Sequence, residues 1–195
     1  KEKRSAIFYL TPSSIKGTAF LTFDYPEASK DDDQWLYMPA LRKTRRISAA
    51  NRGDYFLGTD LTYEDIKLET RISKVDYNYK TIGTEIIKGH KCYVLEGAPK
   101  NEKIAKELGH SKVKYWVDAT YWMLRKADSW DIAGNKLKTV EISEIKKVQG
   151  IWTYHKILVK NHKTTHQTIF RISQVDYKKP LSDDLFTKES LVNGI

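Results

Sequence analysis

The chain has 195 residues, a length that favours one domain with a sizeable core and needs no disulfide or metal to hold it together. Its 40% hydrophobic and 12% aromatic residues, with 10 Gly and 5 Pro, exclude collagen-like, coiled-coil and disordered chains. The 34 Lys and Arg against 25 Asp and Glu give a net charge of +9, which favours nucleic acid, anionic lipid headgroups or acidic proteins as partners without choosing among them.

The predicted elements are mostly strands, because β-branched and aromatic residues recur with period two between clusters of Gly, Pro, Asp and Asn. In chain order, we expect strands at residues 4–10, 17–24, 35–38, 42–48, 69–77, 84–88, 91–97, 112–118, 122–130, 137–148, 151–162 and 165–176. The turns between the later strands have only about two to five residues, too few for the crossover that a parallel pair needs. The sequence therefore predicts an antiparallel meander.

Helical signals are few and short. Thr62 and Asp65 have the spacing of a capping box, which predicts a turn of helix over residues 63–66. Residues 101–108 form a short amphipathic pattern that ends at Gly109. A third helix is expected after residues 182–184, whose acidic side chains suit a helix N-terminus. Helices this short can only plug or cover a sheet.

Motifs with a clear catalytic mechanism are absent, since the chain has no Gly-rich phosphate loop, nucleophile elbow, zinc-peptidase pair or paired-cysteine motif. The sequence thus predicts neither an enzyme nor a cofactor. His155, His162 and His166 fall on neighbouring predicted strands and could be zinc ligands, but strand histidines without clustered carboxylates or thiols are usually solvent-facing. We therefore predict no metal site. Cys92, alone in the chain, is interpreted as a buried, inert thiol.

A basic cluster offers one alternative function. Its five cations are Arg42, Lys43, Arg45, Arg46 and Arg52, and the nearby rings are Trp35, Tyr37, Tyr55 and Phe56. Cations interleaved with aromatic residues on a sheet are typical of single-stranded nucleic-acid binding. The chain lacks the aromatic motif of common RNA-binding sheets, and such modules are usually shorter. Nucleic-acid binding therefore remains the alternative hypothesis.

The aromatic content of the sheet points elsewhere. Several strands carry large apolar groups on both faces, such as Tyr115 beside Trp116 and Ile169 beside Phe170, so both faces must be covered. A sheet curled on itself would do this and shelter an apolar interior large enough for a ligand. The rings and aliphatic groups expected to line it are Trp35, Tyr37, Phe56, Trp116, Trp122, Leu124, Trp130, Trp152 and Phe170. A shift of one residue would turn any strand's set outward. Lys138 is interpreted as a surface lysine.

Longer stretches resemble a known family. They are the run DQWLYMPALRKTRRI at residues 33–47, GTDLTYEDI at 58–66, SIKGTAFL at 14–21, GIW at 150–152 and DDLFT at 183–187. Together they are similar to the outer-membrane lipoprotein-sorting proteins related to LolA. The resemblance covers nearly the whole chain, and its core at residues 33–47 is long enough to be fairly specific.

The resemblance implies a mainly β fold, namely a curled antiparallel meander that forms an unclosed half-barrel with a few short helices at its mouth. It also implies a non-enzymatic, monomeric carrier in the periplasm of Gram-negative bacteria that shelters acyl chains of a lipid or lipoprotein and meets a membrane-associated donor or acceptor protein. The basic cluster would contact headgroups or that partner at the rim. Residues 1–195 would be a single domain that lacks the family's leading helix and first strand, with any targeting segment outside this chain.

Overall fold

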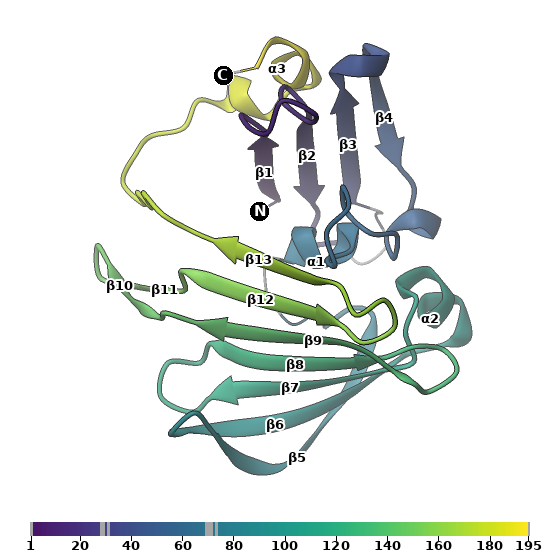
Figure 1. The fold of residues 1–195 in the computed structure, drawn as a ribbon, viewed down its shortest axis with the longest axis vertical. Coiled ribbons are helices and arrows are strands. Elements are labelled where there is room, and N and C mark those ends of the chain that lie inside the picture. Colours follow the sequence, from purple (N-terminus) through teal and green to yellow (C-terminus); the bar gives the residue numbers. More distant parts are fainter. Residues whose placement is uncertain (1, 28–29, 31, 69–71, 73, 195) are drawn as a thin grey trace. The chain divides into compact units, whose positions relative to one another are not determined.

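Antiparallel strands make up most of the chain in the computed structural model, which describes residues 2–27, 30, 32–68, 72 and 74–194 (Figure 1). The described strands belong to sheets that do not close into a barrel, and the connecting helices are short. This confirms the expected fold class. Among the residues that the structure describes, no helix has both the length and the apolarity to cross a membrane.

The chain divides into two compact units. Unit 1 comprises Lys1–Arg52 and Lys179–Ile195, and unit 2 comprises Gly53–Lys178. The expectation of a single domain over residues 1–195 stays a prediction.

Unit 1 is a four-stranded sheet in the order β1-β2-β3-β4. Its elements are β1 (Lys3–Phe8), β2 (Ala19–Asp24), β3 (Asp33–Met38), η1 (Pro39–Leu41), β4 (Lys43–Ile47), η2 (Ala49–Asn51), η3 (Asp183–Phe186) and α3 (Lys188–Asn193). The C-terminal helix α3 lies on one face of this sheet, where Leu191 is buried against Ala19 and Leu21. The chain's two ends therefore share one small core.

Unit 2 is built on a seven-stranded sheet in the order β13-β12-β9-β8-β7-β6-β5, with the two-stranded hairpin β10-β11 beside it. Its elements are α1 (Tyr63–Leu68), β5 (Tyr77–Ile87), β6 (His90–Pro99), α2 (Glu102–Leu108), β7 (Lys112–Asp118), β8 (Leu124–Trp130), β9 (Lys136–Ser143), β10 (Lys146–Val148), β11 (Ile151–Thr153), β12 (Lys156–Asn161) and β13 (Gln167–Arg171). The predicted antiparallel meander is confirmed here.

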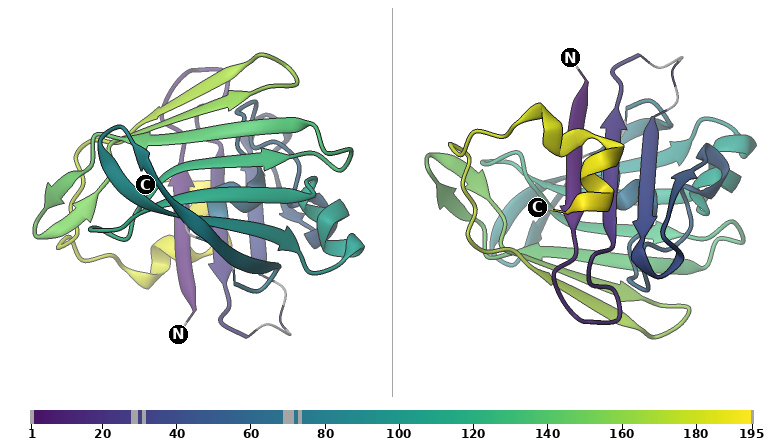
Figure 2. Two further views of the ribbon diagram at one scale, coloured as in Figure 1. Left: turned by 90° about the horizontal axis from the view of Figure 1, so that it is seen from below. Right: turned by 90° about the horizontal axis from the view of Figure 1, so that it is seen from above.

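The β5-β6 hairpin is longer than expected. The predicted strand 84–88 is the end of β5, and a two-residue turn with positive φ at Lys88 (50°) and Gly89 (82°) joins it to β6. Of the predicted strand 69–77, residues 69–71 and 73 lie outside the described residues. The hairpin runs across neighbouring strands (Figure 2, left), and Lys88 Nζ donates to Glu141 on β9 at 2.8 Å.

Two predicted strands are interrupted. The runs 137–148 and 151–162 each split into two strands, so that β10 and β11 form their own short ladder. Glu144 has a φ of 56°, a left-handed conformation that cannot continue a ladder, and its carbonyl oxygen lies 3.0 Å from His155 Nδ1. The left-handed backbone at Glu144 therefore ends the strand, and a period-two pattern of side chains does not predict such a conformation.

The expected helix caps are present. Asp65 accepts from the Thr62 backbone N at 2.8 Å, and the Thr62 hydroxyl accepts from the Asp65 backbone N at 3.1 Å, which completes a capping box at the start of α1. At α2, Asn101 Oδ1 accepts from the Ile104 N at 2.9 Å, and Gly109 takes a φ of 74° after the last turn.

The strand register divides the seven-stranded sheet into two faces, since residues directly opposite each other point to the same side. The apolar face carries Tyr79, Tyr93, Leu95, Val113, Tyr115, Val117, Leu124, Ala127, Val140, Val159 and Phe170. The charged face carries Lys80, Glu96, Lys114, Trp116, Lys126, Asp128, Trp130, Glu141, Leu158, Lys160 and Ile169.

Candidate ligand-binding face

One part of the apolar face is covered by the segment that precedes α1 and contains its first four residues. We call residues 55–66 the covering segment. Its Leu61 and Ile66 pack in one cluster with Val159 and Phe170 of β12 and β13. Val159 is fully buried. The covering segment therefore closes the β9-β12-β13 side of the face.

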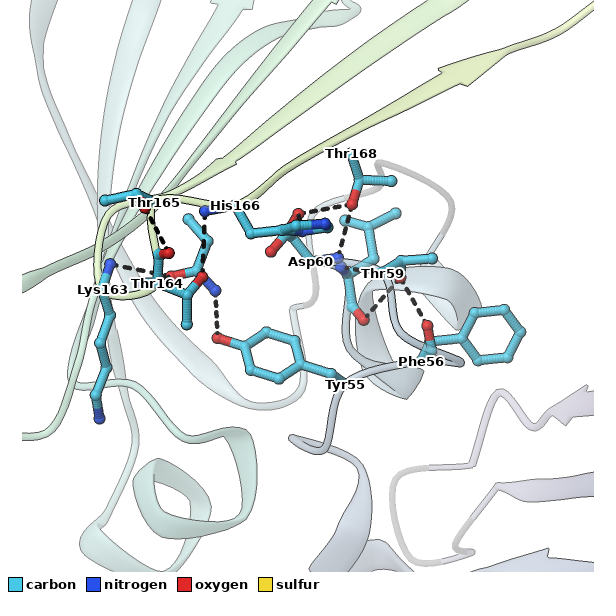
Figure 3. A network of polar contacts seen from close by, with 11 residues as sticks. Tyr55, Phe56, Thr59, Asp60, Lys163, Thr164, Thr165, His166 and Thr168 are labelled. Carbon is cyan, nitrogen blue, oxygen red and sulfur yellow. Dashed lines mark hydrogen bonds and ion pairs between the residues drawn. The ribbon is translucent and has the colours of Figure 1, made fainter.

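Polar contacts hold the covering segment in place (Figure 3). The side chain of Asp60, only 4% exposed, accepts from the Thr168 hydroxyl at 2.6 Å and lies 2.7 Å from His166 Nδ1. The Asp60 backbone N donates back to Thr168 Oγ1 at 3.0 Å. The Tyr55 hydroxyl accepts from Asn161 Nδ2 at 2.8 Å. Hydrogen bonds to a buried carboxylate are among the stronger ones, so this network fixes the segment to the β12-β13 hairpin.

A second attachment lies on the apolar face itself. Lys138 of β9 is only 8% exposed and forms an ion pair with Asp65 of α1. Burial alone would raise the pKa of the Asp65 carboxyl, but the Lys138 charge and its hydrogen bond outweigh burial, so that pKa is lowered. The expectation of a surface lysine at 138 is thus wrong, because the register turns this long side chain toward α1.

The β5-β7 side of the face is lined by tyrosines and covered by α2. Tyr77 and Tyr79 stack with ring centroids 5.5 Å apart, and Leu108 of α2 packs against this group together with Val113. Burial raises the pKa of the Tyr77, Tyr79 and Tyr115 hydroxyls. Gly97 makes the packing possible, since a Cβ there would lie 2.4 Å from the Tyr79 ring.

Between these covered parts the apolar face stays partly exposed. We call Tyr93, Leu95, Val117 and Leu124 the open strip. Tyr93 is 36% exposed, and the other three members are half-buried. At one end of the strip, Trp122 is 71% exposed and stacks on Tyr93 with centroids 5.6 Å apart. This surface of aliphatic and aromatic groups suits an apolar ligand, whose affinity comes from area removed from water.

The structure separates the residues that the sequence assigned to one lining. Leu124 and Phe170 lie on the apolar face, and Trp122 lies at its edge. Trp116 and Trp130 lie on the charged face. Phe56 is buried in the covering segment against Tyr63, Trp152 lies on β11 against Tyr121, and Trp35 and Tyr37 belong to unit 1. The predicted lining residues of unit 2 therefore do not share one face of its sheet, and the roles of all nine residues in binding stay predictions.

Trp116 and Trp130 have lysines beside their rings. Lys114 Nζ and Lys126 Nζ lie 4.6 and 4.3 Å from the Trp116 ring centroid. Trp116 Nε1 also donates to Glu85 at 2.8 Å, and Lys112 Nζ lies 4.3 Å from the Trp130 ring. These cation–π contacts give both rings a structural role on the charged face.

The basic cluster is divided in the same way. Arg46 is opposite Trp35 on β3 and forms an ion pair with Asp33 at 2.5 Å, whereas Arg45 is opposite Leu36 and points to the other side of β4. Lys43 shares the side of Arg45, Arg42 lies in the turn after η1, and Arg52 follows η2. Tyr55 and Phe56 belong to unit 2. Arg46 thus shares a side of the unit 1 sheet with Trp35 and Tyr37, and its guanidinium carbon lies 5.8 Å from the Trp35 ring centroid. The cations of β4 nevertheless divide between both sides of that sheet, and nothing in this arrangement favours nucleic-acid binding.

Similar proteins agree with this fold. A family model described as that of an uncharacterized protein matches residues 1–193. A DUF1329 family protein from Desulfovibrio piger is 31% identical, with 98% of this chain and 78% of that chain covered and a TM-score of 0.87. The chain belongs to the DUF1329 family. No curated protein matches the chain.

Two further solved structures are similar to this DUF1329 protein over nearly its whole length. A Vibrio parahaemolyticus domain described as an outer membrane lipoprotein-sorting protein is 28% identical over 98% of this chain and 78% of that chain, with a TM-score of 0.86. A LolA superfamily protein of Nitrosomonas europaea is 23% identical over 96% and 77%, with a TM-score of 0.69, which shows the fold alone. The expected resemblance to LolA-related proteins is confirmed.

Sequence reasoning missed Tyr93, Leu95 and Val117 as members of the DUF1329 protein's open strip. A signal was present in the sequence, because Tyr93 and Leu95 alternate in the predicted strand 91–97, as Tyr115 and Val117 do in 112–118. The predicted lining relied mainly on tryptophans and therefore omitted these three residues.

The three histidines of the possible zinc site have separate partners. His166 lies against Asp60, His162 Nε2 is 2.8 Å from Thr139 Oγ1, and His155 is bonded near Glu144. In the described part of the chain, no group of three His, Cys, Asp or Glu side chains could hold a metal ion. Cys92 is buried, and burial raises the pKa of its thiol, as its interpretation as an inert group requires.

Proposed function

We propose that this DUF1329 protein is a periplasmic carrier that shelters acyl chains of a lipid or lipoprotein on the apolar face of unit 2. It acts by binding, without catalysis, as a monomer that meets a membrane-associated donor or acceptor protein. The observation that carries the proposal is the open strip, an exposed apolar surface between two covered parts of the same sheet face. The likeness to lipoprotein-sorting folds supports the same cargo.

The energetics of acyl chains fit such a surface. Each methylene removed from water contributes about 0.8 kcal/mol, so a sixteen-carbon chain gains on the order of 12 kcal/mol on full burial. A chain lying along Leu95, Val117 and Leu124 would cover the aliphatic groups, and the Trp122 and Tyr93 rings would flank one end of it. The cations of β4 remain a prediction for contact with a headgroup or the partner protein.

A matched pair of variants tests the proposal. Leu124 and Leu158 are both half-buried leucines of this sheet, but Leu124 is on the apolar face and Leu158 on the charged face. We expect Leu124→Asn to weaken binding of a fluorescent fatty acid by about tenfold, because it places a polar amide under the acyl chain. Leu158→Asn should bind like the unchanged protein.

Thermal melts establish that both variants are folded before affinities are compared. Equal affinities for the two folded variants, or no uptake of fatty acid by the unchanged protein, would contradict acyl binding on the apolar face. Native mass spectrometry of protein from a periplasmic fraction then identifies the bound lipid.

A further inference from the structure

Three turns meet at one end of the seven-stranded sheet, at the left in Figure 1. They are the β5-β6 turn, the β7-β8 turn and the β10-β11 hairpin. We call residues 86–93, 118–125 and 146–153 the tip. The Ala119 N donates to the Lys91 carbonyl at 2.9 Å, and the Tyr121 and Trp152 rings lie 4.0 Å apart, so the three turns are in contact.

Large apolar side chains are exposed at this tip. Trp122 is 71% exposed, Ile86 66% and Ile151 48%. Trp122 stacks on Tyr93, while its neighbour Tyr121 packs against Trp152, so the rings extend from β6 to β11 across the β7-β8 turn. Such a group of exposed apolar residues marks an interaction site more often than a plain surface.

The exposure of Trp122 is fixed by a buried carboxylate. Trp122 has a φ of 57°, a conformation that bulky residues rarely adopt. Asp118, whose side chain is 2% exposed, accepts from the backbone N of Thr120 at 2.8 Å and of Tyr121 at 3.0 Å, and from Arg125 Nε at 2.6 Å. The Asp118 carbonyl also accepts from the Trp122 N at 3.0 Å. The turn that presents this indole is therefore an ordered one.

Cations outnumber carboxylates in the tip, although Lys88 and Arg125 are ion-paired and Gln149 Nε2 of the tip donates to Asp176 at 2.9 Å. Its three segments contain the cations Lys88, Lys91, Arg125, Lys146 and Lys147 and one carboxylate, Asp118, which is buried and paired with Arg125. Lys88 reaches Glu141, outside the tip, and Lys147 Nζ lies 5.2 Å from the Trp152 ring. Exposed rings next to lysines complement a partner with an apolar interior and negatively charged groups at its boundary with water.

We propose that the tip docks on the surface of a bilayer that contains anionic phospholipid. Indole and phenol rings favour the boundary between headgroups and acyl chains, where their apolar body and polar edge are both satisfied. Each lysine near an anionic surface strengthens binding by about fivefold. The surface would serve the proposed carrier function, since the open strip ends at Trp122, but membrane docking is measurable without any cargo.

The experiment measures binding of the full chain to vesicles of phosphatidylcholine alone and to vesicles that also contain phosphatidylglycerol. We expect binding only to the anionic vesicles, weakened by added salt and accompanied by a blue shift of tryptophan emission. Trp122→Asn, which keeps the left-handed backbone accessible, should weaken binding on the order of tenfold. Lys146→Gln with Lys147→Gln should weaken it by about fivefold per lysine.

Lys100→Gln with Lys106→Gln is the matched control, because both lysines are exposed on unit 2 around α2 and away from the tip. It should bind like the unchanged protein. No binding to anionic vesicles, or equal binding by folded Trp122→Asn, would overturn the docking proposal. Fatty-acid uptake without vesicle binding would overturn docking alone, and vesicle binding through Trp122 without uptake would overturn only the carrier function.

Discussion

The two faces of the seven-stranded sheet bury large side chains by different means. On the charged face, Glu141 lies between Lys88 and Lys160, and lysines flank the ring of Trp116. On the apolar face, helices and the covering segment supply the cover. A ring on the charged face is shielded by side chains of the same sheet. The apolar face is shielded by separate elements, the covering segment and α2, which need their own contacts to stay in place. The apolar face can therefore leave the open strip uncovered, because the four residues of the strip are uncharged and form no ion pairs.

Among the changes that distinguish the two faces, truncation of Trp116 should cause the largest loss of stability. The side chain is 3% exposed and packs with Cys92 and Val94, so Trp116→Ala should cost about 3 kcal/mol or more of unfolding free energy. Fatty-acid affinity of the folded variant should not change, because the ring lies on the charged face. Urea titration measures the unfolding free energy, and ligand titration measures the fatty-acid affinity. A weakened affinity in the folded variant would show that the ligand binds on the charged face instead.

Release of the covering segment should have an intermediate effect. Asp60→Ala removes the acceptor for Thr168 and the partner of His166, and should cost about 2 kcal/mol because buried polar groups lose their partners. Hydrogen exchange should accelerate at residues 55–66. Unchanged exchange there would show that the other contacts of the segment, namely the Lys138–Asp65 pair, the Tyr55–Asn161 hydrogen bond and the packing of Leu61, hold it without Asp60. The amides of β5 to β8 serve as the internal control.

The ion pairs of the charged face should contribute least. Hydrogen bonds from Lys88 and Lys160 lower the pKa of Glu141 from 4.5 to about 2. A carboxyl whose pKa is lower in the folded chain stabilises it above pH 4.5, and this contribution is lost as pH falls from 4.5 toward 2. Because the side chain is partly exposed, Glu141→Gln should cost only about 1 kcal/mol at pH 7.

Stability curves of Glu141→Gln and the unchanged protein should converge between pH 4.5 and 2. A constant difference across that range would mean that the glutamate acts through packing rather than through its charge.

Local patterns predicted the elements of this fold well. The capping box at Thr62 and Asp65, the Asn101 and Gly109 caps and the strand at 112–118 need only a few neighbouring residues, and each is present as expected. The resemblance at residues 33–47 predicted the family for the same reason, because it is a property of the chain itself. The left-handed Glu144 was not predictable, since its conformation depends on the strand across the hairpin.

The sequence by itself determined that strands alternate, that the meander is antiparallel and that the surface is basic. Only the tertiary structure decided which side each alternating set takes. Leu124 and Trp130 share one parity in β8, but the register shifts between Trp116 and Val117, so Leu124 is opposite Val117 while Trp130 falls on the charged face. A period of two is symmetric between the faces, and one extra residue in a strand exchanges them. That choice is made by pairing between strands and by the segments that cover them.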